Sequence, residues 1–319
     1  MKPLAEPPTF SIVITAYEAA ATVGAAVQSA LEQSVPPHQV IVVDDGSGDD
    51  IEGALRPYRD RIDVIRRENG GGAAARNTGA EAASGDFMAI LDADDAYHPR
   101  RLEAIAELAG ARPELDLVTT DARLILGGEE VGSFADATPF ATRDQRTSIF
   151  ETCFVGGWPA VRLSRLESIG GFDESFRIAY DWDCWLRAIL DGAEAGFVDE
   201  PLYDYVLHDG SLSANRVASL WERARLLEKA TGNPNLREEE RPALNRAVRM
   251  NRSRAATAEV RASLYRGGPR LRLGRLPAAP RLEPHARIEA LLAAVAPPLA
   301  RRMLPDDRPA DDRFEKAAA

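Results

Sequence analysis

Apolar segments alternate with amphipathic ones over the first third of the chain. Two short β-branched runs, Phe10–Thr15 and Val40–Val43, have no helical period and predict buried strands. Between them, Ala19–Gln33 places apolar residues at helical spacing and predicts a helix. The chain therefore begins as strand, helix, strand.

The same alternation continues to residue 120. The further elements expected are a helix over Asp50–Tyr58, a strand over Ile62–Ile65, a helix over Ala73–Ala83, a strand over Phe87–Leu91, a helix over Pro99–Ala109 and a strand over Leu115–Thr120. Continuous apolar strands that alternate with helices are typical of a parallel sheet covered on both faces. We therefore predict an α/β fold with a mostly parallel central sheet.

Beyond residue 120 the pattern weakens. Gly127–Ala141 has little periodicity and predicts a loop or an edge hairpin, whereas Trp158–Leu163 and Gly196–Val198 can add strands. Asp181–Leu190 predicts a helix with Trp182 and Trp185 at core-facing intervals.

The sequence pattern changes again after His208. Ser219–Ala230 and Glu238–Arg266 predict helices, and a Gly/Pro/Arg-rich connector follows over Gly267–Pro284. We expect three regions: an α/β domain over 1–214, a helical region over 215–305 and an acidic, unstructured tail over 306–319.

Charge separates these regions. The chain has 39 Lys and Arg against 50 Asp and Glu, a net charge of −11, which disfavours a cationic nucleic-acid binder. Residues 1–214 hold 17 basic and 37 acidic residues, a net charge of −20, whereas residues 215–319 hold 22 and 13, a net charge of +9. Opposite signs suggest two different roles.

Compartment signals are weak but consistent with the cytoplasm. Cys153 and Cys184 have no metal-ligand spacing and form no disulfide framework, which favours a reducing compartment, although one bridge between them stays open. Met1–Pro8 lacks the features of a signal peptide. The longest apolar stretch, near Leu291–Ala300, is about half of the ~20 residues that a membrane span needs.

Polar clusters follow three of the predicted strands: Thr15–Tyr17, Asp44–Ser47 and Asp92–Asp95. Ligands of doubly wound folds bind at the carboxyl ends of the strands, so these clusters are the candidate site. Asp92 and Asp94 point to the same side, and hard cations such as Mg²⁺ or Mn²⁺ prefer such oxygen ligands. The alternative is a solvated acidic turn in which Asp94 or Asp95 caps the helix that begins near Pro99.

The other candidates each have a structural alternative. Asp44–Ser47 can bind a base or ribose, or can form a turn. Asn69–Gly72 opens a helix without a dinucleotide or phosphate-loop fingerprint, and Arg76 one turn later can pair with a diphosphate or lie in a surface ion pair. Asp181 is a general base or a helix N-cap. His208, in a polar loop after a strand-like segment, can supply a metal ligand, whereas His38, His98 and His285 look like solvent or turn residues.

Taken together, these motifs resemble those of family 2 glycosyltransferases with the GT-A fold. The matching segments, over about residues 8–214, are Ser11–Tyr17, Val42–Ser47, Asn69–Gly79, Leu91–Asp95, Gly171–Glu174 and Asp181–Arg187. The resemblance implies a GT-A catalytic domain over 1–214, in which Thr15, Tyr17 and Asp45 hold the nucleoside, Arg76 lies near the base or diphosphate and Asp92 contacts the ribose. It also implies that Asp94 and His208 bind the divalent metal, Mg²⁺ or Mn²⁺, and that Asp181 is the base. The family often has Glu before that aspartate, where this chain has Tyr180.

The expected activity is inverting transfer of a sugar from a nucleotide-diphosphate sugar to a hydroxyl of a glycan or lipid-linked acceptor. The alternatives are a sugar nucleotidyltransferase, an NAD-dependent oxidoreductase, or a non-catalytic sugar-nucleotide-binding protein of the same fold. Residues 215–305, with a net charge of +11, either pack on the acidic domain, form a dimer contact or attach peripherally to the inner face of the membrane. Oligomeric state, donor and acceptor stay open.

Overall fold

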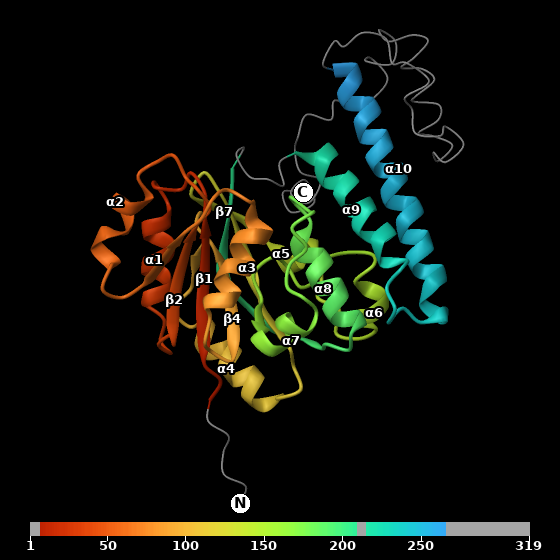
Figure 1. Ribbon diagram of the computed structural model, residues 1–319. Coiled ribbons are helices and arrows are strands. Elements are labelled where there is room, and N and C mark those ends of the chain that lie inside the picture. The colour runs from red at the N-terminus through yellow and green to blue at the C-terminus, as the bar shows by residue number, and fades with distance from the viewer. Residues whose placement is uncertain (1–6, 209–214, 266–319) are drawn as a thin grey trace, which may run out of the picture. The chain divides into compact units, whose positions relative to one another are not determined.

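The computed structural model describes residues 7–208 and 215–265 (Figure 1). Its contacts divide these residues into two compact units, with the boundary directly after His208. The first unit contains a mixed sheet and its covering helices, and the second contains two long helices.

The sheet of the first unit is parallel in its first half and mixed in its second. Its strands are β1 Phe10–Ala16, β2 Gln39–Asp44, β3 Asp63–Arg66, β4 Phe87–Asp92, β5 Ala96–Tyr97, β6 Leu117–Leu126, β7 Glu129–Ser133, β8 Ala160–Arg162 and β9 Ala195–Leu207. They lie in the order β3-β2-β1-β4-β8-β6-β9-β5, and β7 pairs with β6. Strands β3, β2, β1 and β4 are parallel, as the sequence predicts, whereas β8 is antiparallel to both β4 and β6.

Helices cover both faces of this sheet. They are α1 Val23–Leu31, α2 Ile51–Leu55 continued by the 3₁₀ helix η1 Arg56–Tyr58, α3 Gly72–Ala82, α4 Arg101–Ala111, α5 Phe134–Ala137, α6 Gln145–Ser148, α7 Leu163–Ser168 and α8 Tyr180–Leu190. In Figure 1, α3 crosses one face of the strands near β1 and β2, in agreement with its contacts.

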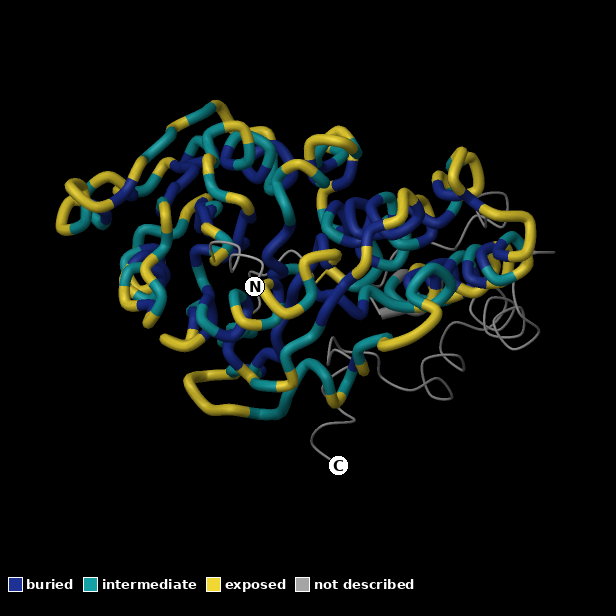
Figure 2. The backbone as a smooth tube through the Cα atoms, turned by 90° about the horizontal axis from the view of Figure 1, so that it is seen from below, coloured by how far each residue is buried: buried dark blue, intermediate teal, exposed yellow. Residues whose placement is uncertain are grey.

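Strand β1 shows why the first strands are apolar without interruption. Its residues Ile12 and Ile14 belong to the core cluster that includes the α1 residues Val23 and Val27. Val13 points to the other face, where a Cβ built on Gly79 of α3 would lie 2.2 Å from its Cγ1. Alternate side chains of the strand are thus buried on opposite faces, and glycine is required for α3 to pack so closely. Figure 2 shows these buried segments through the middle of the unit.

The second half of the sheet differs from the predicted pattern. The strand predicted over Gly196–Val198 is the start of β9, a 13-residue strand that runs on to Leu207. Its pairing with β6 shifts register near Asp121, opposite Pro201, which explains why no single period spans it. The unpatterned segment after Gly127 forms the edge strand β7, so the expected edge hairpin is confirmed.

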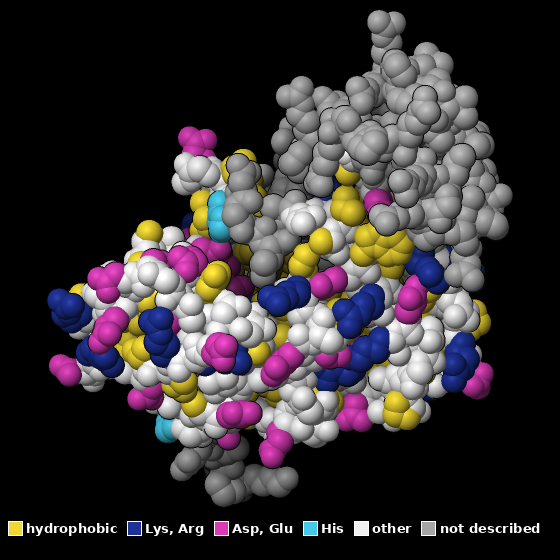
Figure 3. All heavy atoms as spheres, turned by 45° about the horizontal axis from the view of Figure 1, so that its top comes forward, with side chains coloured by type: hydrophobic (Ala, Val, Ile, Leu, Met, Phe, Trp, Pro, Cys, Tyr) yellow, Lys and Arg dark blue, Asp and Glu magenta, His cyan; other side chains and the backbone are white. Residues whose placement is uncertain are grey.

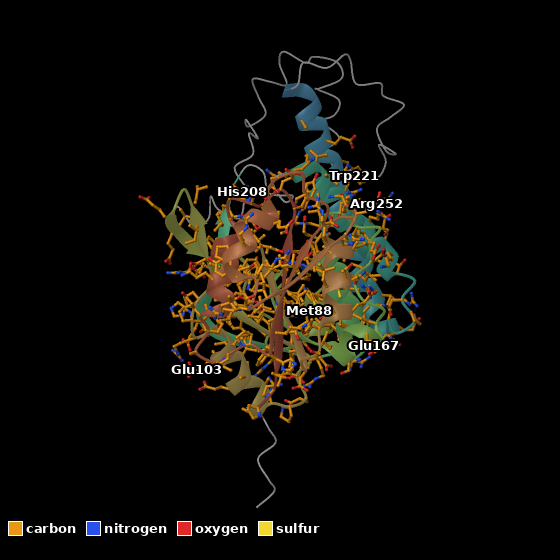
Figure 4. The ribbon with its side chains drawn as sticks, turned by 60° about the vertical axis from the view of Figure 1, so that its left-hand side comes forward. Met88, Glu103, Glu167, His208, Trp221 and Arg252 are labelled. Carbon is orange, nitrogen blue, oxygen red and sulfur yellow. The ribbon has the colours of Figure 1, made fainter. Side chains whose placement is uncertain are left out.

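The second unit is a helical hairpin. Helix α9 spans Arg216–Ala230, and α10 spans Arg241–Tyr265 after the 3₁₀ turn η3 at Glu238–Glu240. Between the two helices, Arg252 pairs with Glu228 at 3.0 Å and the Trp221 indole donates to Glu259 at 3.1 Å (Figure 4). The predicted connector, the apolar stretch near 291–300 and the acidic tail lie outside the described residues. Within 7–208 and 215–265, no helix has the length and apolar character needed to cross a membrane.

Candidate active site

The polar ends of the parallel strands meet at one edge of the sheet, as the alternation predicts. Thr15 at the end of β1 is the register partner of Asp92 at the end of β4, and its Oγ1 donates to Asp92 Oδ1 at 3.2 Å. On the other side, Ala16 is the partner of Asp44 at the end of β2. In Figure 3, acidic side chains (magenta) gather on this face beside a histidine (cyan).

The end of β9 brings a histidine to the turn after β4. His208 Nε2 lies 2.7 Å from Asp94 Oδ2, although the two residues are 114 positions apart. Both side chains remain accessible, with 44% of His208 and 38% of Asp94 exposed. Figure 4 shows His208 at the edge of the first unit and Met88 of β4 in its interior. The structure therefore places together the two residues predicted as metal ligands.

The next carboxylate, Asp95, is buried and faces inward. Its Oδ2 accepts a bond from the Tyr203 hydroxyl at 2.6 Å, and its Oδ1 accepts one from the Val206 amide at 2.8 Å. Burial raises the pKa of Asp95 well above its usual range, and the nearby Asp92 and Asp94 raise it further. Asp95 thus ties β9 to the β4 turn two residues before His208.

A buried cation lies beneath this connection. Arg101, at the start of α4, donates to Thr120 Oγ1 and to the Trp158 carbonyl, and its guanidinium lies 4.7 Å from the Tyr97 ring and 5.1 Å from the Tyr203 ring. Burial lowers the pKa of Arg101, and the two tyrosines oppose that shift. This role was not predicted, because an arginine in the first turn of an amphipathic helix is usually a surface residue.

The structure also shows whether the acidic turn caps the following helix. Neither Asp94 nor Asp95 caps α4, because its N-cap is Arg100 and that position makes no side-chain cap bond. The helix-cap alternative is therefore wrong for this turn. Asp92 and Asp94 instead keep 35% and 38% of their side chains exposed at the sheet edge.

The turn after β2 uses its carboxylates differently. Asp45 is 3% exposed, and it accepts bonds from the Gly70 amide at 3.0 Å, the Gly71 amide at 2.7 Å and the Arg67 guanidinium. Tyr17, in contrast, is 56% exposed after the end of β1. Asp45 therefore fixes the glycine loop before α3, and Tyr17 is the accessible member of this side of the site.

Arg76 lies behind Asp92. Its side chain is 2% exposed, and Nη2 donates to Asp92 Oδ1 at 3.0 Å and to Oδ2 at 3.2 Å. Its guanidinium also lies 5.0 Å from the Tyr180 ring and 5.8 Å from the Phe172 ring. Burial alone would lower the pKa of Arg76, but Tyr180, Asp92 and Asp181 raise it. The pair is thus buried on the arginine side, and the surface ion pair considered from the sequence is wrong.

Helix α8 positions Asp181 in its first turn. The N-cap of α8 is Ala179, so Asp181 is not the cap that the sequence left open. The Asp181 Oδ1 accepts a bond from the Trp182 amide at 2.7 Å, and a Cβ built on Gly157 would lie 3.2 Å from its Oδ2. Asp181 therefore lies against the 156–158 loop and is partly exposed.

The tryptophans of α8 anchor the helix, as predicted for core residues. The Trp182 indole donates to the Ile149 carbonyl at 2.7 Å, and the Trp185 indole donates to the Gly156 carbonyl at 2.9 Å. Arg187 donates to the carbonyls of Ile169 and Gly171. The first turn of α8 is thereby held in place from two loops.

Comparison with known proteins agrees with this geometry. A sequence model of Glycosyl transferase family 2 matches residues 11–164. The putative teichuronic acid biosynthesis glycosyltransferase TuaG of Bacillus subtilis is 30% identical over 223 residues, which cover 68% of this chain and 85% of TuaG. The chain belongs to glycosyltransferase family 2.

Solved structures show that this glycosyltransferase has the GT-A fold. The S. aureus TarS 1–349 complex with UDP-GlcNAc superposes with a TM-score of 0.65 at 18% identity, covering 90% of this chain and 81% of that one. The mannosyltransferase PcManGT of Pyrobaculum calidifontis, in complex with GDP-Man and Mn²⁺, gives 0.58 at 20% identity, covering 91% and 85%. Of the activities considered from the sequence, membership of this family supports sugar transfer.

The glycosyltransferase brings most of its predicted site residues into one cluster. Thr15 and Arg76 each donate a hydrogen bond to Asp92, and Asp94 is bonded to His208. Asp181 lies close enough to Arg76 to raise its pKa. Tyr17 and Asp45 lie on the β1 and β2 side, where Asp45 binds the glycine loop.

The possible metal ligands of this glycosyltransferase, Asp94 and His208, suit a hard cation that also binds the substrate. No group of three or more His, Cys, Asp or Glu side chains in the described ranges is arranged to hold a metal ion. Asp94 and His208, whose side chains meet here, would supply two ligands, and Mg²⁺ is commonly bound by one or two carboxylates together with water and substrate phosphates. The residues present therefore fit a metal that binds with the diphosphate.

Proposed function

We propose that this glycosyltransferase moves a sugar, with inversion, from a nucleoside-diphosphate sugar to a hydroxyl group of a glycan or lipid-linked acceptor. The observation that carries the proposal is the exposed Asp92, Asp94 and His208 group at the carboxyl edge of the sheet. The relative TuaG is named for teichuronic acid biosynthesis and ExoU of Rhizobium meliloti for succinoglycan biosynthesis, which supports a role in polysaccharide synthesis.

Donor binding follows from the chemistry of this edge. We propose that Thr15, Tyr17 and Asp45 form the nucleoside side and that Asp92 contacts the ribose. Asp94 and His208 would hold a divalent cation, Mg²⁺ or Mn²⁺, which neutralises the charge of the leaving diphosphate. Residues 1–214 carry a net charge of −20, so an anionic donor would be repelled without such a cation.

Asp181 supplies the proton acceptor in this proposal. Its carboxylate takes the proton of the acceptor hydroxyl while that oxygen forms a bond to the anomeric carbon. The bond from that carbon to the diphosphate oxygen breaks on the opposite face, and its electrons leave with the nucleoside diphosphate. The partial exposure of Asp181 in the first turn of α8 leaves it accessible to an acceptor.

A donor panel tests the proposal. The full chain is incubated with UDP-, GDP- and dTDP-sugars in MnCl₂, and release of the nucleoside diphosphate is measured. We expect turnover with one class of donor and a loss of at least about 100-fold in Asp181→Asn, the scale of general-base catalysis. Asp60→Asn is the matched control, because Asp60 is exposed and precedes the amino end of β3. Full turnover in Asp181→Asn would contradict the assignment of the base.

The basic second unit is proposed to contact an anionic membrane surface. Its helix α10 exposes Arg246, Arg249 and Arg254, which favours binding to anionic headgroups. Flotation of the full chain with anionic vesicles at low and high salt tests this. Binding at low salt that is lost at high salt supports it, and no binding at low salt leaves internal packing or a dimer contact as the role of the unit.

A further inference from the structure

Arg76 has little surface with which to touch a substrate. Its side chain is 2% exposed, although Asp92, to which it donates two bonds, is 35% exposed. Among the described residues, Asp92 is the only carboxylate that accepts a hydrogen bond from Arg76. The Nε and Nη1 atoms of Arg76 are buried and have no hydrogen-bond partner within this part of the chain. Arg76 therefore holds the Asp92 carboxylate from the protein interior.

The other face of this arginine packs on the first residue of α8. The guanidinium carbon of Arg76 lies 5.0 Å from the centre of the Tyr180 ring, within the range of a cation–π interaction. Tyr180 is 8% exposed and directly precedes Asp181. The Tyr180 ring and the Asp181 carboxylate therefore belong to neighbouring residues in the first turn of α8.

Gly72 makes room for this ring. A Cβ built on Gly72, the first residue of α3, would lie 2.5 Å from the Tyr180 hydroxyl oxygen and 2.9 Å from the ring carbon that bears it. The glycine has no positive φ, so an alanine here would collide with the Tyr180 ring but would not strain the backbone. The Tyr180 ring thus lies near both Gly72 and Arg76, which are about one helical turn apart in α3.

We propose that Arg76 is a positioning residue that couples Asp92 to the start of α8 through Tyr180, and that Gly72 permits this coupling. Arg76 holds the Asp92 carboxylate by hydrogen bonds and holds the Tyr180 ring by its face. The donor carboxylate and the base are thereby fixed to one buried cation. This inference rests on the proposed roles of Asp92 and Asp181.

Gly72→Ala tests the coupling without altering Arg76, Asp92 or Asp181. The new methyl group displaces the Tyr180 ring, so we expect kcat to fall about ten-fold, the scale of one cation–π contact, while the Kd of UDP or GDP in MnCl₂ changes less than about three-fold. Gly110→Ala is the matched control, because a Cβ there meets nothing within 4 Å and Gly110 also lies in a helix.

Substitutions of the two partners complete the test. Tyr180→Leu removes the ring and should reproduce the kcat loss of Gly72→Ala, whereas Tyr180→Phe keeps the ring and should stay within about two-fold of wild type. The Gly72→Ala/Tyr180→Leu double variant should be no worse than Tyr180→Leu alone, since both act through one contact. Arg76→Lys should lower kcat and also weaken nucleotide binding, because Asp92 loses its planar partner.

Two results would overturn the coupling. One is a kcat within two-fold of Gly110→Ala in both Gly72→Ala and Tyr180→Leu, and the other is multiplication of their effects in the double variant. Thermal unfolding of each variant identifies any that fails to fold, and Tyr180→Leu then decides if Gly72→Ala is lost. Asp181→Asn separates the two levels: its full activity contradicts the proposed function, whereas its inactivity with a silent Tyr180→Leu contradicts the coupling alone.

Discussion

Two acidic turns follow parallel strands of the same sheet, and they use their carboxylates in opposite ways. In the turn after β2, the side chains of Asp44 and Asp45 are each 4% exposed, and their oxygens accept bonds from backbone amides and arginines. In the turn after β4, the side chains of Asp92 and Asp94 are 35% and 38% exposed, and Asp95 is the one buried carboxylate. The first turn fixes a loop, whereas the second leaves two carboxylates accessible at the proposed donor site.

This difference has a physical cause in what surrounds each turn. The glycine loop at 70–71 lies against Asp45 and offers amide donors, so that carboxylate is satisfied within the protein. The β4 turn meets the end of β9, whose Tyr203 and Val206 bind Asp95 and leave Asp94 to His208. Similar sequences therefore differ in role because different segments pack on them.

The largest effect is expected from Asp94→Ala. The variant loses one of the two proposed metal ligands, so donor turnover in MnCl₂ should fall by at least about 100-fold while stability changes little at this half-exposed site. Turnover and thermal unfolding are measured side by side. Activity within ten-fold of the Asp60→Ala control would show that the β4 turn does not present the metal ligand.

Asp45→Asn tests the structural role of the turn after β2. Asparagine cannot accept all the bonds that Asp45 receives from Gly70, Gly71 and Arg67, so we expect a loss of about 2 kcal/mol in the free energy of unfolding. Urea unfolding measures this loss. Nucleotide affinity should fall equally with and without MnCl₂, because the nucleoside side is disturbed and the metal side is not; a loss confined to MnCl₂ would contradict the separation of the two turns.

Asp95→Asn should behave as a weaker version of Asp94→Ala. Asparagine retains the size of Asp95 but offers only one acceptor for the Tyr203 hydroxyl and the Val206 amide, so the end of β9 loosens. We expect MnCl₂-dependent nucleotide affinity to fall about ten-fold through a misplaced His208. Unchanged affinity, measured by calorimetry, would show that the end of β9 is positioned by other contacts.

The smallest effect is expected at the amino ends of the parallel strands, opposite the candidate site. Asp86 accepts bonds from the Thr9 amide at 2.8 Å and the Thr9 hydroxyl at 2.7 Å, and these bonds lower its pKa below the ordinary 3.8. Its stabilisation is present above pH 3.8 and is lost as the pH falls through the lower folded pKa. Asp86→Asn should therefore cost at most about 1 kcal/mol at pH 7, less near pH 3, and nothing in nucleotide affinity. Urea unfolding at both pH values checks this; a cost that grows as the pH falls would contradict it.

The sequence predicts the exposed residues of the site better than the buried residues that pack beneath them. Asp92, Asp94 and His208 stand at ends of apolar strand-like segments, where the strand rule locates ligands. Nothing in the pattern distinguishes Asp45 from Asp94, because burial depends on which distant segment covers the turn. Arg101 and Tyr203 are buried together only through packing between α4 and β9.

Strand direction explains most of what the pattern missed in the fold. Hydrophobic periodicity marks β8 but carries no information on its orientation, so its antiparallel pairing with β4 was not predicted. The length of β9 was hidden by Pro201 and by the register shift opposite Asp121. The parallel strands β1 to β4 were predictable because short connections and helices of regular length link them.

Calorimetry of nucleotide binding with and without metal tests whether the β4 turn holds the donor diphosphate through a cation shared by Asp94 and His208. UDP and GDP are titrated into the full chain, His208→Ala and Asp94→Ala, in MnCl₂ and in EDTA. We expect the preferred nucleotide to bind wild type at least about ten-fold more tightly in MnCl₂, and both variants to lose this difference. Equal affinity of wild type in MnCl₂ and EDTA would contradict it.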